Sequence, residues 1–320
     1  MLRLPRNAPT PMAGLALGIA SLGLCWDTTF GYGGYVQCLA AGIAGVPLAL
    51  LLIKFIDQPR MLWAELGHPV IGSVVPTFAM ALMIISMAVG HASTTLEITL
   101  WLIAIVLHLL FMATFTVQRC RQWALSHVVP SWFVPPVGII VADVTFPGAL
   151  YLHELAVGLL YFGMGLYAVL LPLMLYRFMF STPVPDAAKP TVAIMAAPAS
   201  LSLAGYLTVV PMPSLLLVAL LASIALLMTT VTYLALLHLL RLPFSPGYAA
   251  FTFPLVISAT AMFKLAHWLT VQPLLNQHVE AIYRLAEVEL AMATVVVVYV
   301  TGRYLHYYVQ AAWRASTAAT

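Results

Sequence analysis

Residues 215–228 read LLLVALLASIALLM and form the centre of an apolar run over 214–237. A helix needs roughly 20 apolar residues to cross about 30 Å of hydrocarbon, so this run is long enough to span a membrane. Similar runs follow one another along the rest of the chain, with short breaks between them. The sequence therefore predicts an all-α integral membrane protein.

The composition supports this fold class. Apolar residues make up 63% of the 320 positions and charged residues 7%, which is too little polar surface to cover a water-soluble globule. No polar stretch is long enough to fold outside the membrane, so residues 1–320 are expected to form a single transmembrane domain. The dispersed basic residues argue against a nucleic-acid partner. The three cysteines lack a CxxC pair, so neither a metal site nor a cofactor is expected.

The apolar runs and the basic residues together predict ten spans. If the amino terminus is cytoplasmic, the cytoplasmic segments collect all but two, Lys264 and Arg284, of the 13 Lys and Arg residues. This positive-inside bias predicts a multi-pass protein of the cell (inner or plasma) membrane with both termini in the cytoplasm. The ten predicted spans are 11–29, 36–53, 70–90, 98–117, 130–150, 155–176, 191–210, 214–237, 247–266 and 281–302.

The odd-numbered runs differ from the even-numbered ones. The even runs are rich in Leu, Ile and Val, which is typical of helices that face lipid. The odd runs carry glycines or prolines, which are tolerated inside a bundle or against a watery cavity. These are Gly14, Gly18 and Gly23 in the first run, Pro76 in the third, Pro135 and Pro136 in the fifth, Pro198 in the seventh and Pro254 in the ninth. We therefore expect five helical hairpins, with an inner ring of odd helices around a central pore and an outer ring of even helices. The competing architecture is a pair of inverted repeats with a site at broken helices.

Five segments carry a resemblance to known transport proteins. They read AGLALGIASLGLCW at 13–26, AELGHPVIGS at 64–73, PSWFVPPVG at 130–138, TVAIMAAPASLSLAGYLTV at 191–209 and AFTFPLVISATAMFKLA at 250–266. They resemble the family that contains the TehA tellurite-resistance proteins, the plant guard-cell slow anion channel, the yeast malic-acid (C4-dicarboxylate) transporter and the fungal sulfite exporter. The TFP sequence at 252–254 is the most specific, since it marks the pore-lining ninth span of that family.

The resemblance implies an anion channel whose pore is closed by a phenylalanine. It also implies ten spans and a homotrimer of independent pores. Carried onto this chain, the gate is Phe253, followed directly by Pro254, and a bulky apolar ring can close a narrow path by steric block and dewetting. The alternative is a proton-coupled transporter of C4-dicarboxylates such as malate, or of sulfite or tellurite. The expected partners are membrane lipid and small anions, namely chloride, nitrate, sulfite or a dicarboxylate.

Further candidates follow from position along the runs. The pore-lining candidates are Gly18, Pro76, Pro135, Pro136, Val141, Pro198, Ser202 and Ser258. No ring of basic residues crosses the predicted pore, so helix ends at the proline breaks and hydroxyl groups are expected to favour anions. Lys264 is expected either to draw anions to the pore mouth or to snorkel to the headgroups. Asp143 is either solvated at the interface or a proton carrier.

Other function classes are less well supported. An intramembrane enzyme would need a nucleophile with its base or a set of metal ligands, and the sequence contains no HExxH and no GxSxG motif. We therefore expect no enzymatic activity. A receptor or structural role is not excluded by the sequence, but it would leave the proline-broken inner helices unexplained.

Overall fold

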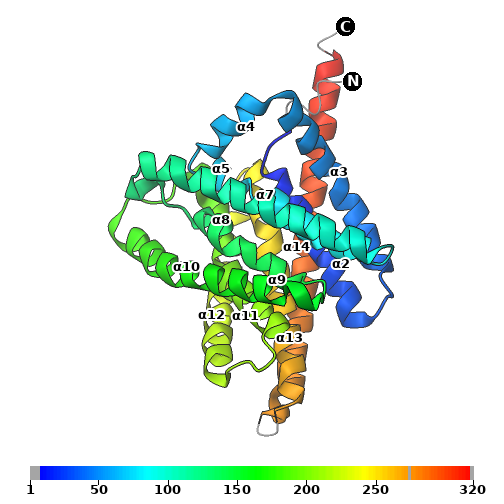
Figure 1. Cartoon of the computed structure of the whole chain (residues 1–320). Coiled ribbons are helices and arrows are strands. Elements are labelled where there is room, and N and C mark those ends of the chain that lie inside the picture. Colours follow the sequence, from blue (N-terminus) through cyan, green and yellow to red (C-terminus); the bar gives the residue numbers. More distant parts are fainter. Residues whose placement is uncertain (1–7, 273–274, 318–320) are drawn as a thin grey trace.

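The protein was analysed as a computed structural model, which describes residues 8–272 and 275–317, with side chains up to Gln310. Within these ranges every regular element is a helix (Figure 1). The long helices are α2 (Met12–Phe30), α3 (Tyr35–Asp57), α6 (Thr77–Gly90), α7 (Thr94–Arg121), α10 (His153–Phe180), α11 (Ala197–Val209), α12 (Leu215–Leu239), α13 (Thr252–Thr270) and α14 (Val279–Thr317). The short α-helices are α4 (Pro59–Leu66), α5 (Ile71–Val74), α8 (Val134–Val137) and α9 (Val141–Val144).

Tight 3-10 turns extend or connect several of these helices. Those that matter here are η2 (Pro130–Phe133), η3 (Gly138–Ile140), η5 (Asp186–Ala196) and η6 (Pro246–Phe251). Each begins at or contains a proline or a glycine. Proline removes a backbone donor, and glycine relaxes the helical geometry. Consequently the fifth, seventh and ninth apolar segments are irregular in their first half, and the third is divided between α5 and α6 at Pro76.

Nine helical segments within the described ranges are long and apolar enough to cross a membrane. The fifth predicted span differs from its expected bounds, because 130–150 contains only a shorter apolar stretch, Pro130–Val144. Pro130, Pro135 and Pro136 divide it into η2, α8, η3 and α9, so it has no continuous helix of spanning length. Ten crossings therefore remain a prediction, although the fold is that of a helical integral membrane protein.

The odd segments form the inside of the bundle. Buried residues make up 67% of the best apolar window of α2 and 78–83% of those of the third, seventh and ninth segments, against 28–39% in the even ones. The odd helices also close a ring, since α2 packs on α6 and α13, α11 packs on α13 and α9, and α9 packs on α6. Each is covered by the next helix along the chain. The predicted inner and outer rings are therefore confirmed.

The two ends of the described chain lie on one side of the bundle. The hydroxyl of Tyr308, near the end of α14, is 3.4 Å from Sδ of Met12, where α2 begins. Figure 1 shows the last turns of α14, in red, extending beyond the other helices at this side. This arrangement agrees with an even number of crossings.

Side chains of α7 satisfy the irregular backbone of the fifth segment. Trp101 Nε1 donates to the carbonyl of Ala142 at 3.0 Å, and His108 Nε2 lies 2.7 Å from the carbonyl of Pro135. Both side chains are fully buried. Because lipid offers no donors, non-helical backbone at membrane depth is stable only where protein supplies them.

Candidate functional site

A first cavity lies where the irregular halves of the odd segments meet, and we call it the proline-side cavity. All five odd segments contribute to its wall, which is almost entirely apolar. Its lining includes Gly14 and Leu17 of α2, Val74 and Thr77 of the third segment, Phe133 and Val137 of the fifth, Thr191 and Pro198 of the seventh, and Ala250, Phe253 and Pro254 of the ninth. The cavity is therefore on the axis of the ring.

Two further cavities continue along this axis. The middle cavity is bounded by residues that include Ser21, Val141, Leu201, Phe253 and Thr260, and its volume of about 10 Å³ is close to that of a single water. The third, which we call the lysine-side cavity, holds about 630 Å³. Thr260 lines both the middle and the lysine-side cavities. The ring axis is thus wide at its lysine side and narrow at its centre.

Phe253 stands at the boundary between two of these cavities. Its side chain lines both the proline-side and the middle cavity and is 6% exposed. It belongs to the first turn of α13, directly after η6. Thr252 fixes this turn, because its hydroxyl donates to the carbonyl of Ala249 at 2.7 Å and lies 3.2 Å from the carbonyl of Gly14. The side chain of Phe253 therefore belongs to the walls of both the proline-side and the middle cavity.

Lys264 lies in the wall of the lysine-side cavity. The same wall carries the hydroxyls of Thr28, Thr29 and Thr260 and the imidazole of His267. Within residues 8–272 and 275–310, no hydrogen bond or ion pair engages the Lys264 ammonium, and the side chain is half-buried. A cation in the wall of a cavity attracts anions.

The sequence-predicted candidates divide into two groups. Val141, Pro198, Phe253, Pro254 and Lys264 line one or more of the three cavities. The remaining pore-lining candidates contribute to none of these walls, and they are Gly18, Pro76, Pro135, Pro136, Ser202 and Ser258. Several of the latter contact neighbouring backbone or side chains instead, such as Ser202, whose hydroxyl donates to the carbonyl of Pro198 at 2.7 Å.

Asp143 lies outside the three cavities. It is fully buried on α9, and neither carboxylate oxygen has a hydrogen-bond partner among the described residues. Its Cβ faces α11, because a methyl group added at Gly205 would lie 3.2 Å from it. An isolated carboxylate in such a place is very costly in its charged form.

Glu289, which was not among the sequence-predicted candidates, is buried within the last apolar run. Its side chain, on α14, is 3% exposed, and its Oε2 accepts a hydrogen bond of 2.7 Å from Ser258 of α13. The signal was present in the sequence, since Glu289 interrupts the predicted span 281–302 and ionisable residues inside a membrane are rarely incidental.

Comparison with known proteins connects this geometry to a family. Residues 7–305 match the family described as voltage-dependent anion channel. Two uncharacterized transporters of Methanocaldococcus jannaschii are also similar. One is 33% identical over 166 residues, covering 47% of this chain and 48% of that protein, and the other is 33% identical over 180 residues, covering 51% and 50%. The matched region thus spans about half the length of these curated relatives.

Proposed function

Because the chain belongs to the voltage-dependent anion channel family, we propose that it passes small anions along the axis of the inner helix ring. The observation that carries this proposal is the row of three cavities on that axis, with Phe253 between the first two. The proposed anions are chloride, nitrate, sulfite or a dicarboxylate. They move down their electrochemical gradient when the path is open.

Phe253 is the gate in this proposal. Its ring is apolar and stands where the free space falls to about 10 Å³, too little for a hydrated anion. A constriction of this kind blocks ions both sterically and by excluding water. Rotation of the ring, or displacement of the first turn of α13, joins the proline-side and middle cavities.

Weak electrostatic attraction favours anions over cations in this path. α6, α11 and α13 all begin beside the proline-side cavity, and the amino-terminal ends of helices carry partial positive charge. Lys264 adds a full positive charge at the other end of the axis. Weak binding suits conduction, because an ion must leave the site as readily as it enters.

The test is anion flux from proteoliposomes or conductance in planar bilayers. We expect Phe253→Ala to raise the conductance for chloride and nitrate. Phe251→Ala is the matched control, since it removes a buried ring two residues away that lines none of the three cavities. Background conductance of correctly inserted Phe253→Ala protein would show that Phe253 is not the gate.

The second candidate is a proton-coupled transporter of C4-dicarboxylates, or of sulfite or tellurite. The fully buried, unpartnered carboxylate of Asp143 favours it, because such a group is suited to carry a proton. Loss of pH-driven malate uptake in Asp143→Asn would support this carrier. Unchanged passive flux in the same variant would favour the channel.

The assembly and location are proposed on the family resemblance. We propose a homotrimer in which each chain has its own pore, embedded in the lipid of the inner or plasma membrane. Cross-linking in native membranes, followed by mass analysis of the purified complex, tests the trimer. A single-chain mass under conditions that preserve activity would contradict it.

A further inference from the structure

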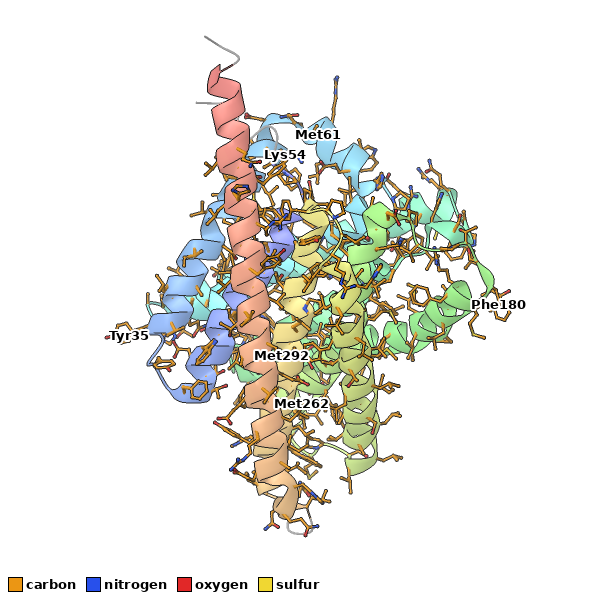
Figure 2. The ribbon with its side chains drawn as sticks, turned by 180° about the vertical axis from the view of Figure 1, so that it is seen from behind. Tyr35, Lys54, Met61, Phe180, Met262 and Met292 are labelled. Carbon is orange, nitrogen blue, oxygen red and sulfur yellow. The ribbon has the colours of Figure 1, made fainter. Side chains whose placement is uncertain are left out.

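A buried carboxylate joins the helix that carries Phe253 to its outer neighbour. Glu289 of α14 is 3% exposed, and its partner Ser258 is fully buried on α13. These two helices pack along much of their lengths. Figure 2 shows Met262 and Met292, each about one turn beyond Ser258 and Glu289 respectively, on these neighbouring helices. The contact is therefore in the interior of the bundle, away from its ends.

The carboxylate is the end of a short chain of hydroxyl groups. Thr229 of α12 lies 2.8 Å from the Ser258 oxygen, and Ser258 lies 2.7 Å from Oε2 of Glu289. Hydroxyl groups both donate and accept hydrogen bonds. The bonds can therefore point toward Glu289 when its carboxylate is ionised and away from it when the carboxyl group is protonated. The site therefore provides hydrogen bonds to both protonation states of Glu289.

The described side chains around Glu289 include no counter-ion, so the ligand that fits this site is a proton. In the part of the chain whose side chains are described, no ion pair joins a Lys, Arg or His to Glu289. From α12, the titratable group near it is Tyr233, whose buried hydroxyl has no partner, and α13 contributes only Ser258. On α14 itself, Arg284 and Glu287 are exposed. A charge buried without a counter-ion is expensive, and binding a proton removes it.

Protonation changes the strength of the bond to the gate helix. Ser258 follows Phe253 by five residues, about 7.5 Å along α13. An ionised carboxylate accepts a hydrogen bond roughly twice as strong as a neutral one does. Building on the proposed channel, we propose that Glu289 is a proton-binding site whose protonation loosens α13 from α14 and so raises anion flux.

The experiment compares nitrate flux from proteoliposomes containing the full chain at about pH 5 and about pH 8, on either side of the range in which a perturbed carboxyl group titrates. We expect the wild-type flux to be about five-fold higher at the acid pH, from the difference between a charge-assisted and a neutral hydrogen bond. Glu289→Gln, which stays neutral, gives the acid-level flux at both pH values. Glu287→Gln, an exposed carboxylate two residues away, behaves as the wild type. Ser258→Ala, which keeps the carboxylate, raises the flux at the alkaline pH.

A second readout separates this proposal from the channel itself. pH-difference infrared spectroscopy reports the carboxyl C=O band, which we expect to lose one component in Glu289→Gln and none in Glu287→Gln. If no variant conducts, Phe253→Ala included, the channel is refuted while the band still tests proton binding. Wild-type pH dependence that survives in Glu289→Gln, or a band unchanged in that variant, overturns the proposal.

Discussion

Gly18 of α2 faces Thr252 of α13 so closely that no side chain fits between them. A Cβ added at Gly18 would lie 2.3 Å from Oγ1 of Thr252 and 3.2 Å from the backbone nitrogen of Phe253. Thr252 is β-branched and fully buried, so it cannot turn aside at low cost. Gly18 therefore sets the distance between α2 and the turn that carries Phe253.

We expect Gly18→Ala to push α13 away from α2 and to destabilise the protein by about 2 kcal/mol, as overpacking of a dense interior does. The same displacement should raise basal anion flux, because the ring of Phe253 moves with its helix. Unfolding in a detergent titration measures the first effect and proteoliposome flux the second. Gly42→Ala on α3 is the control, since its new methyl group would meet nothing within 4 Å and the residue lines none of the three cavities. Equal stability and flux in the two variants would contradict this account.

A buried ion pair holds the start of α2 to α3 and α4. Lys54 Nζ lies 2.6 Å from Oε1 of Glu65 and 2.9 Å from the hydroxyl of Thr10, which in turn donates to Glu65 at 2.6 Å. The Lys54 side chain is only 4% exposed. Figure 2 shows Lys54 near the end of the bundle where α14 emerges.

Removal of this cation leaves the Glu65 carboxylate without its counter-ion. We therefore expect Lys54→Ala to lower the free energy of unfolding by about 3 kcal/mol. Arg284→Ala breaks an exposed pair with Glu280, in which both side chains are more than 70% exposed, and should cost less than about 1 kcal/mol. Thermal denaturation in detergent compares the two. A loss of similar size in both variants would mean that burial does not strengthen the Lys54 pair.

The ring of odd helices was predictable because its signal is local. Glycine or proline marks each odd segment, and both residue types are tolerated in a membrane where neighbouring protein packs closely or supplies hydrogen bonds. The bounds of the fifth segment were not predictable in the same way. An apolar run over 130–150 looks long enough to span, and only the structure shows how the prolines divide it and where it ends at Val144.

The candidate site was predictable only in part because it depends on rotation about helix axes. Phe253 and Ser258 both lie on α13, yet one lines the axis and the other contacts Thr229 and Glu289. The residue types alone do not show which face of α13 each side chain lies on. The pairing of Ser258 with Glu289 joins residues 31 positions apart and depends on the packing of α13 against α14.

His108 supports the broken fifth segment from α7. Its Nε2 is 2.7 Å from the carbonyl of Pro135, and the ring is fully buried. We expect His108→Phe to leave that carbonyl without a donor and to cost about 1 kcal/mol, the usual worth of an interhelical hydrogen bond in a membrane. His238→Phe is the control, since its ring, in the last turn of α12, makes no hydrogen bond to the described residues. Unfolding in denaturing detergent measures both, and equal stability of His108→Phe and the wild type would refute a supporting role.

His68 accepts hydrogen bonds from the backbone at the entry to α5, beside the proline-side cavity. Its Nδ1 accepts hydrogen bonds from the backbone nitrogens of Val70 and Ile71, at 3.2 and 3.1 Å. Val70 and Ile71 line the cavity. Partial burial, with the positive charges of Arg119 and His127 nearby, lowers the pKa of His68 below its usual value. The folded protein therefore favours the neutral ring, which can accept these bonds.

The stability that His68 contributes is full above the ordinary histidine pKa and is lost as the pH falls toward its lowered value in the folded state, because the unfolded chain binds the proton more readily. We expect His68→Asn, whose side-chain oxygen can still accept hydrogen bonds from this backbone but does not titrate, to remove this component of acid sensitivity. His278→Asn, in an exposed turn, should leave it in place. Melting temperatures measured across the acid range test this prediction. An unchanged pH dependence in His68→Asn would exclude the hydrogen bonds to His68 as the source of the acid sensitivity.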